Sequence, residues 1–164
     1  MSGPEHGNRL RVLIADDDEQ ILECYQEAFC PSEATATMRT LDSLAADLFE
    51  PRADLQEAPH FEVVSCSQGE EAVTLAEQAR RQGDPFDVVI LDVRMPPGID
   101  GVEVGSRIRN LDPNVEIVFV TGFSDVSIEE LERRIPPPMR LHYYNKPLSF
   151  SQLAANVASM IRAN

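Results

Sequence analysis

Short apolar runs alternate with helix-forming segments along this chain, and this alternation limits the fold more than any other feature. The third and fourth runs are almost continuously apolar, which is typical of strands buried on both faces of a parallel sheet. A strand–helix order repeated five times predicts crossover connections, with helices on both faces. We therefore expect a five-stranded, doubly wound α/β domain. The predicted strands lie at residues 11–15, 61–65, 88–91, 116–120 and 140–145.

The predicted helices have recognisable start and stop signals. The pattern Ser67-x-x-Glu70 predicts a capping box at the start of the second helix, and Ser149-x-x-Gln152 precedes the last one. Asp112-Pro113 ends the third helix, and the prolines at 136–138 end the fourth. The apolar stripes of the five helices are Ile21, Leu22, Tyr25 and Phe29; Ala72, Val73, Ala76 and Ala79; Val104, Ile108 and Leu111; Ile128, Leu131 and Ile135; and Leu153, Val157, Met160 and Ile161.

Residues 30–60 interrupt this rhythm between the first helix and the second strand. Prolines at 31, 51 and 59 break the segment, while Met38, Leu41, Leu44 and Leu48 suggest a short amphipathic helix inside it. Either that helix packs back on the domain, or the segment forms a docking or dimerisation surface. We expect a single domain at 9–162 with 30–60 as an insertion and no second domain in this chain, since 164 residues suffice for one core.

Charge and composition exclude several classes of function. The net charge of −14 argues against nucleic acid or anionic lipid as a partner, because phosphate contacts require an excess of Lys and Arg. No apolar run approaches the roughly 20 residues that span a membrane. The N-terminus lacks the apolar core of a signal peptide. Cys24, Cys30 and Cys66 have no metal-ligand spacing and are expected to be reduced thiols. These features predict a cytoplasmic protein.

Polar residues stand at the carboxyl ends of four of the five predicted strands. The first strand runs into the acidic run DDDE at 16–19, the third into Asp92, the fourth into Thr121 and the fifth into Asn-Lys-Pro at 145–147. In open α/β sheets, ligands bind outside the carboxyl ends of the strands, where the strand order reverses. In the flavodoxin-like order 2-1-3-4-5 that point lies between strands 1 and 3. This order would bring the acidic run next to Asp92.

The assembled residues favour phosphoryl chemistry. Two carboxylates about 4 Å apart repel by about 4 kcal/mol at an effective dielectric of 20, so either one takes up a proton or a cation joins them. Oxygen ligands without His or Cys suit a hard ion such as Mg²⁺. The Thr121 hydroxyl and the Lys146 ammonium suit the oxygens of a phosphoryl group. Together these groups predict phosphoryl transfer onto Asp92.

Each of these residues has a simpler interpretation when it is taken alone. An aspartate within 16–18 could be a helix N-cap, and Asp92 could close an Asx-turn. Thr121 could be a strand-end hydroxyl, and Lys146 a solvated surface charge. None of these interpretations explains why all the groups converge on one edge of the sheet.

With these residues in view, the chain resembles the receiver domains of two-component response regulators. The matching pieces are VLIADDDE, VVILDVRMPPGIDGVEV, IVFVTG and YYNKP, in this order. The resemblance covers roughly residues 9–162, except 30–60. It implies a switch in which Asp92 takes a phosphoryl group from the phosphohistidine of a histidine kinase or phosphotransfer protein, with Mg²⁺ as cofactor. It also implies that the protein is no enzyme beyond catalysing its own aspartyl phosphorylation and dephosphorylation.

The resemblance assigns roles to individual positions. Asp92 is similar to the phospho-accepting aspartate. Asp17 resembles the direct Mg²⁺ ligand, Asp16 the acidic residue that binds the ion through water, and the backbone carbonyl of Arg94 the third protein ligand. The remaining positions are those of the catalytic and switching residues: Thr121 resembles the switch hydroxyl, Lys146 the phosphate-contacting lysine, Tyr143 the aromatic that rotates inward, and Lys146-Pro147 the cis peptide of the family. Asp18 occupies a variable position and is not expected to be a ligand.

Two departures from the family pattern stand out. The loop MPPGIDG has one residue more than the commoner MPGxDG, which should change the path of the loop but leave Asp92 and Arg94 in register. The insertion at 30–60 follows a helix rather than the carboxyl end of a strand. It should therefore lie away from the site, and it affects the partner surface rather than the chemistry.

The implied output is a change of the surface formed by the fourth predicted helix (stripe 128–135), the fifth predicted strand (140–145) and the fifth predicted helix (stripe 153–161). A downstream protein or a fused output domain would read this surface, and a homodimer is also left open.

Two alternatives to this function remain. A degenerate receiver would act as a phosphorylation-independent docking module. A haloacid-dehalogenase-like phosphatase would place its nucleophile after strand 1 in a DxDx(T/V) motif, which the DDD-Glu-Gln sequence does not match. Neither GxxxxGK[ST] nor GxGxxG follows strand 1, so a nucleotide site is not supported.

Overall fold

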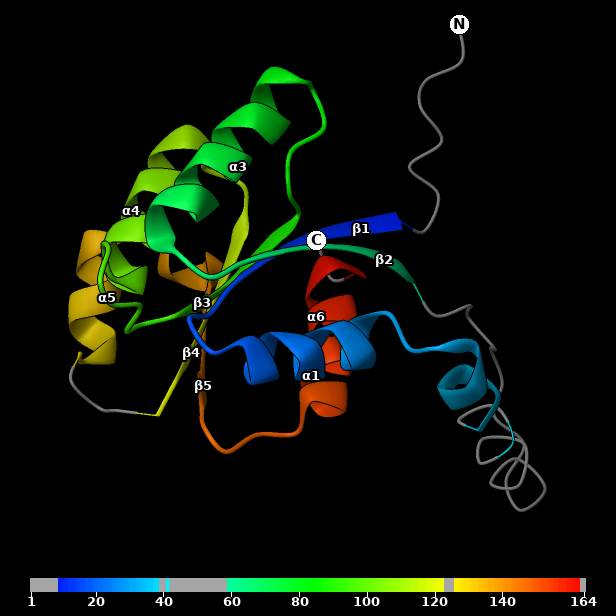
Figure 1. Cartoon of the computed structure of the whole chain (residues 1–164). Coiled ribbons are helices and arrows are strands. Elements are labelled where there is room, and N and C mark those ends of the chain that lie inside the picture. The colour runs from blue at the N-terminus through cyan, green and yellow to red at the C-terminus, as the bar shows by residue number, and fades with distance from the viewer. Residues whose placement is uncertain (1–8, 39–40, 42–58, 123–125, 163–164) are drawn as a thin grey trace, which may run out of the picture.

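The computed structural model describes residues 9–38, 41, 59–122 and 126–162. Within them, five strands form one sheet in the order β2-β1-β3-β4-β5, and every neighbouring pair is parallel. Figure 1 shows the sheet running through the centre of the molecule. The strands are β1 (Arg9–Ala15), β2 (His60–Cys66), β3 (Val88–Asp92), β4 (Glu116–Thr121) and β5 (Leu141–Asn145).

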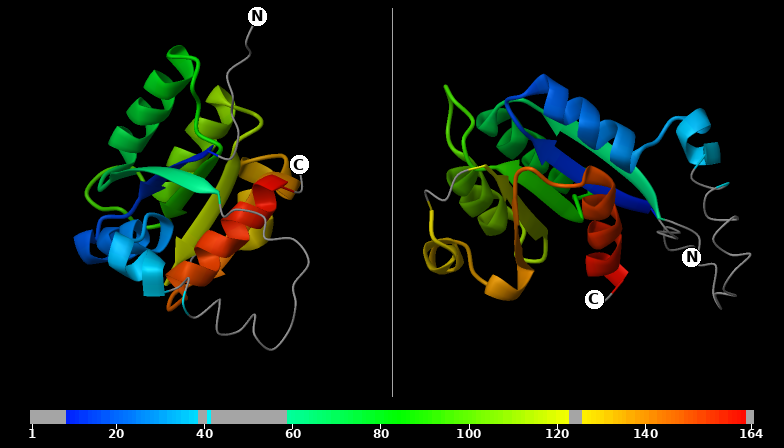
Figure 2. Two further views of the ribbon diagram at one scale, coloured as in Figure 1. Left: turned by 90° about the vertical axis from the view of Figure 1, so that its right-hand side faces the viewer. Right: turned by 90° about the horizontal axis from the view of Figure 1, so that it is seen from below.

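Helices cover both faces of the sheet, as the alternation of elements predicts. Helices α3, α4 and α5 lie on one face, and α1 and α6 lie on the other (Figures 1 and 2). The predicted doubly wound fold and its strand order are confirmed. No helix in the described part of the chain is long and apolar enough to cross a bilayer. The helices are α1 (Glu19–Phe29), α3 (Gly69–Arg81), α4 (Gly101–Leu111), α5 (Ile128–Arg134) and α6 (Phe150–Arg162), with a 3₁₀ turn η1 (Pro138–Arg140) before β5.

Two hydrophobic clusters hold the layers together, one on each face of the sheet. Successive side chains of a strand point to opposite faces, so Ile90 packs with the α1–α6 cluster and Leu91 with the α3–α4–α5 cluster. Both are essentially inaccessible to solvent. Burying a side chain of this size contributes about 1.5–3 kcal/mol. The central strands therefore fix the ends of β1 and β3 rigidly, and these are the ends that carry the candidate site.

Of the two capping patterns that the sequence offers, the structure confirms one and contradicts the other. Ser149 accepts a hydrogen bond from the backbone N–H of Gln152 (3.2 Å) at the start of α6. The capping box predicted at Ser67-x-x-Glu70 is wrong, because Gln68 is the N-cap of α3 and its side chain makes no capping bond. The Glu70 carboxylate instead accepts a hydrogen bond from the backbone N–H of Ile99 (3.1 Å). A tertiary contact has replaced the local one.

The segment between α1 and β2 starts and ends at neighbouring points. Residues 33–38 are helical, and Met38 and Leu41 are 69% and 60% exposed, so these two do not pack on the described domain. The predicted positions Leu44 and Leu48 lie outside the described residues. The Cys30 thiol donates to the carbonyl of Phe61 (3.2 Å), which joins the two flanks at the amino end of β2. The insertion therefore begins and ends away from the carboxyl edge of the sheet.

A buried polar cluster lies at the amino ends of β4 and β5, and the sequence reasoning did not anticipate it. Glu116 is 2% exposed; its carboxylate accepts from Arg140 Nη1 (2.7 Å) and lies 2.9 Å from His142 Nε2. Arg109 is 5% exposed and donates to the carbonyls of Pro113 (3.2 Å) and Arg140 (3.0 Å). This cluster joins α4, β4 and β5 at the edge opposite the candidate site.

Candidate functional site

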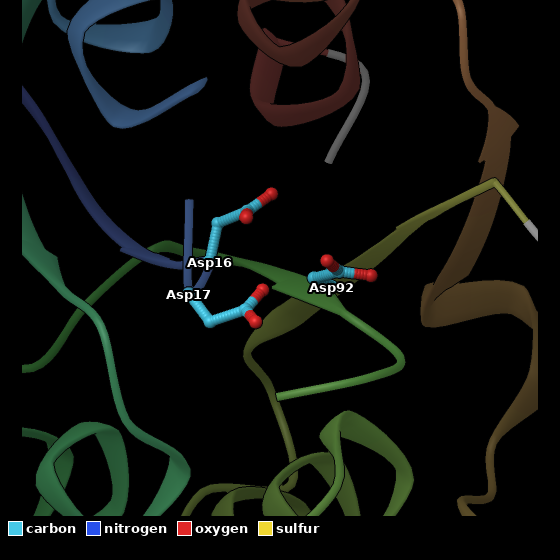
Figure 3. Close-up of side chains that lie close together, drawn as sticks. All are labelled: Asp16, Asp17 and Asp92. Carbon is cyan, nitrogen blue, oxygen red and sulfur yellow. The ribbon is translucent and has the colours of Figure 1, made fainter. Parts of the chain in front are cut away.

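Three aspartates from two neighbouring strands meet at the carboxyl edge of the sheet. Asp16 and Asp17 directly follow β1, and Asp92 is the last residue of β3. Because Ala15 pairs with Leu91 in parallel register, the next residues, Asp16 and Asp92, lie beside each other. One carboxylate oxygen from each of the three lies within 4.8 Å of the others. Figure 3 shows the three side chains grouped at the adjacent strand ends.

The acidic run after β1 is divided between the site and the following helix. Asp16 is 1% exposed, and its Oδ1 accepts the backbone N–H of Asp18 (3.0 Å). Asp17 is exposed. Asp18 is the N-cap of α1, since its Oδ1 accepts the backbone N–H of Gln20 (2.9 Å). The simpler N-cap interpretation is therefore right for Asp18, and Asp16 and Asp17 remain beside Asp92.

Lys146 supplies a cation to the same edge. Its Nζ donates to Asp16 Oδ2 (2.9 Å) and to Asp92 Oδ2 (3.3 Å). The backbone N–H of Lys146 donates to the carbonyl of Thr121 (2.9 Å), so the lysine is anchored where β4 and β5 end. The peptide bond between Lys146 and Pro147 is cis, as the resemblance implies. The lysine therefore does not occupy a free surface position.

Burial and mutual charge shift the pKa values of these groups. Burial and the neighbouring charge of Asp16 raise the pKa of Asp92 above its usual range, and Lys146 opposes the shift. Burial acts to lower the pKa of Lys146, but its hydrogen bond with Asp16 and the two carboxylate charges outweigh burial and raise it. Burial raises the pKa of Tyr25 in α1, and the charges of Asp16 and Asp92 add to that shift. The site thus holds closely spaced negative charge that one ammonium does not fully offset.

A cavity of about 360 Å³ adjoins the site between β4, β5 and the start of α5. Thr121 and Tyr143 both line it, together with Val93. The Tyr143 ring lies nearly parallel to that of Phe119, with centroids 6.4 Å apart. Its hydroxyl is buried and has no hydrogen-bond partner among the described residues, and burial together with Glu132 raises its pKa to about 12. One cavity therefore joins the candidate switch hydroxyl to the candidate switch aromatic.

The loop after Asp92 is closed tightly onto the strand. The backbone N–H of Arg94 donates to Asp92 Oδ1 (3.4 Å), and that of Gly101 donates to the Val93 carbonyl (2.8 Å). A Cβ atom on Gly101 would lie 2.0 Å from the backbone oxygen of Asp92. Met95 is buried, while Arg94 is exposed. Position 101 therefore requires a glycine, because the start of α4 lies directly against the backbone of the strand end.

The donor atoms at this edge suit a hard divalent cation. Asp16, Asp17 and Asp92 offer only oxygens, and their spacing would permit one ion to contact more than one of them. A cation there would also relieve the repulsion between Asp16 and Asp92 that raises the pKa of Asp92. The residues present therefore fit a magnesium site.

The structure places most of the predicted site residues close together. Asp16, Asp92 and Lys146 are in direct contact, Asp17 lies within the acidic group, and Thr121 and Tyr143 line the adjoining cavity. The sequence reasoning missed Glu70, which reaches this loop from α3. The spacing of Ser67 and Glu70 matches a capping signal, and no sequence pattern at positions 70 and 99 indicates their contact.

Comparisons with known proteins point to one family. The family model described as "Response regulator receiver domain" matches residues 52–158. The response regulator receiver protein CpdR of Brucella abortus is 31% identical over 84 residues, which is 51% of this chain and 67% of that protein. The sensor kinase CckA of the same organism is 29% identical over 101 residues, 62% of this chain but only 10% of the kinase. This chain thus spans a small part of some of the relatives that it matches.

Solved structures agree on the fold. A CheY chain from Borrelia burgdorferi, solved in a CheX-CheY-BeF3-Mg+2 complex, superposes with a TM-score of 0.63 at 19% identity, covering 93% of this chain and 89% of that one. The BeF3-activated DrrB receiver domain gives a TM-score of 0.59 at 21% identity and covers 94% and 98%. These likenesses concern the fold alone.

Proposed function

This chain belongs to the response regulator receiver domains of two-component systems, and we propose that Asp92 is its phospho-accepting residue. In the proposed reaction a carboxylate oxygen of Asp92 attacks the phosphorus of a phosphohistidine. A P–O bond forms as the P–N bond breaks, and the imidazole leaves and takes up a proton. The phosphoryl group would come from a histidine kinase or a phosphotransfer protein, and the protein would act on no other substrate.

The observation that carries the proposal is the contact of one ammonium with two carboxylates at a strand edge. Lys146 Nζ lies 2.9 Å from Asp16 and 3.3 Å from Asp92, although 54 residues or more separate the lysine from either partner. An ammonium within hydrogen-bond reach of the nucleophile can also reach an oxygen of the incoming phosphoryl group. There it would stabilise the negative charge that develops during transfer. Asp92 is only partly exposed, so few water molecules compete with that interaction.

Asp17 and Asp92 would hold Mg²⁺ directly, Asp16 would bind it through water, and the Arg94 carbonyl would complete the protein ligands. When bound, the ion would neutralise charge on the phosphoryl oxygens. The protein side chains have separate tasks. Asp16 is buried and positions both Lys146 and the turn at Asp18, whereas Asp17 is exposed and available. Such a division would give the two adjacent aspartates different roles.

Phosphorylation would then act through the cavity that Thr121 and Tyr143 share. A phosphoryl group on Asp92 would attract the Thr121 hydroxyl. The Tyr143 ring would then move into the space that the Thr121 side chain vacates. The added charge of about −1.5 to −2 would shift the population between two packings of α5, β5 and α6. Partners would read that surface. NMR signals of the Tyr143 ring that stay unchanged on phosphorylation would contradict this coupling.

The proposal is tested by phosphoryl uptake that depends on Mg²⁺. The full chain is incubated with acetyl phosphate and Mg²⁺, with or without excess EDTA, and its intact mass is measured. We expect one phosphoryl group with Mg²⁺ and none with EDTA. We also expect Asp17→Asn to weaken Mg²⁺ binding at least about tenfold in calorimetric titration, since it removes a direct ligand. A wild-type protein that neither binds Mg²⁺ nor gains mass would refute the proposed function.

Lys146→Met is expected to change two measurements in opposite directions. Loss of the ammonium removes a charge-assisted hydrogen bond to the phosphoryl group, so the rate of phosphorylation should fall about 10- to 100-fold. The same loss frees the Asp16 and Asp92 carboxylates from a competing cation, so Mg²⁺ should bind more tightly. The rate comes from mass spectrometry and the affinity from titration. If the phosphorylation rate and the Mg²⁺ affinity both fell, the substitution would merely have disturbed the structure of the site.

A docking module that is never phosphorylated remains the second candidate. The exposed Met38 and Leu41, which lie within the insertion, favour some protein contact independent of the site. This candidate predicts partner binding that is identical for wild type and Asp92→Asn.

A further inference from the structure

Glu70 in the first turn of α3 contacts the loop that carries the proposed metal-binding carbonyl. Its Oε1 accepts the backbone N–H of Ile99 (3.1 Å). A Cβ atom on Gly69 would lie 2.7 Å from the Ile99 carbonyl oxygen, so the helix start lies directly against the loop. These two contacts hold the loop from outside, at a point 29 residues away in the chain from Glu70.

The same carboxylate also lies directly over position 98. A Cβ atom on Gly98 would lie 2.2 Å from Glu70 Oε2, which leaves no room for a side chain while the carboxylate stays in place. The backbone of Gly98 is not left-handed, so a side chain at this position would meet the Glu70 carboxylate rather than backbone strain. The carboxylate therefore fits closely over the outer part of the loop.

A hydrogen bond closes the loop that contains both Ile99 and Arg94. The hydrogen bond from the Gly101 N–H to the Val93 carbonyl (2.8 Å) ties the two ends together. Val93 and Met95 are buried and anchor the inner part, whereas the residues from Pro96 to Gly98 are exposed. Glu70 holds the outer part, where this loop is one residue longer than the commoner pattern.

From this geometry we infer that Glu70 is a positioning residue for the proposed magnesium site. It holds the lengthened loop in the path that presents the Arg94 backbone carbonyl to the cation, and it acts by accepting the Ile99 N–H rather than through its charge. The inference rests on the proposed function, because it concerns the ligand set of that site. Glu70 itself touches neither the ion nor the phosphoryl group.

Calorimetric Mg²⁺ titration of the full chain tests the inference with four single variants. Glu70→Ala removes the acceptor, and Gly98→Ala displaces the carboxylate while the charge stays; each should weaken Mg²⁺ binding about tenfold. Glu70→Gln keeps an oxygen acceptor, and Glu71→Ala removes an equal charge one residue away. Both variants should bind Mg²⁺ with an affinity within about twofold of wild type. Phosphorylation by acetyl phosphate at saturating Mg²⁺ should proceed at the wild-type rate in all four, with only the Mg²⁺ midpoint shifted.

The double variant Glu70→Ala, Gly98→Ala gives the sharpest result. Once Glu70 is shortened, the new Cβ at position 98 has room, so the double variant should bind Mg²⁺ no more weakly than either single variant. Additive losses, a Glu70→Gln variant as weak as Glu70→Ala, or a reduced maximal rate with an unchanged midpoint would each overturn the inference. If wild type binds no Mg²⁺, the proposed function fails with it; if wild type binds and Glu70→Ala binds equally, the inference alone fails.

Discussion

Asp92→Asn is expected to abolish phosphorylation of this protein. The amide lacks the negative charge of the carboxylate and is a very poor nucleophile towards phosphorus, and removal of a nucleophile costs several orders of magnitude in rate. We expect uptake from acetyl phosphate to fall by at least about 1000-fold, which brings it to background. Intact mass spectrometry after incubation with Mg²⁺ measures the loss directly. Hydroxylamine, which cleaves acyl phosphates, should remove the phosphoryl group from the wild-type protein.

The control for this variant is Asp18→Asn. Asp18 lies two residues from the buried Asp16, but its side chain caps α1 and an asparagine caps a helix equally well. Asp18→Asn should therefore be phosphorylated at the wild-type rate. If Asp92→Asn still gains a phosphoryl group, the modification lies on another residue, and the assignment of Asp92 is wrong.

Gly101→Ala is expected to destabilise the fold by about 3 kcal/mol, the largest stability change proposed for a single methyl group in this protein. The added Cβ would lie 2.0 Å from the Asp92 carbonyl oxygen and 3.1 Å from the Val93 Cα, and both are backbone atoms, which cannot move aside as a side-chain end can. Alanine favours a helix over glycine by up to about 1 kcal/mol, so a net loss must come from this overlap. Thermal unfolding should show a midpoint about 6–12 °C lower.

Gly122→Ala provides the matched comparison for Gly101→Ala. The nearest atom to a Cβ at position 122 is the Lys146 Cβ at 4.0 Å, which is ordinary contact distance. Its stability should stay within about 0.5 kcal/mol of wild type. Equal midpoints for the two alanine variants would show that the loop after Asp92 can move away from α4, and would weaken the account of how that loop is held.

The fold and most of the site follow from short-range sequence patterns. Continuous apolar runs such as 88–91 and 116–120 predict central strands, because a strand buried on both faces needs apolar side chains in both directions. Polar residues directly after such runs must lie at the carboxyl edge once the strands are parallel. The contact of Lys146 with Asp92 is therefore a consequence of topology that the strand order already contains. That these residues perform phosphoryl transfer stays a prediction.

The contacts that the sequence did not reveal involve side chains from separate elements. Glu70 matches a capping pattern, yet its carboxylate bonds to Ile99, since the loop comes within its reach only in the folded protein. Ile128 belongs to a predicted apolar stripe but is 49% exposed, and it lines the open cavity that Thr121 and Tyr143 share. Glu116 opens an otherwise apolar strand, and only the approach of Arg140 and His142 explains its burial. Side-chain type at one position does not specify such partners.

The contact between Cys30 and Phe61 has a practical consequence for engineering. Because the polypeptide departs and returns at adjacent points, the domain sets little requirement on how many residues connect them, and lengthening a surface connection costs only a fraction of a kcal/mol per doubling. Fluorescent reporters or ligand-responsive modules could be grafted between these two residues, at the end of the sheet remote from the candidate site. The segment between Cys30 and Phe61 is therefore a suitable insertion site for building a biosensor.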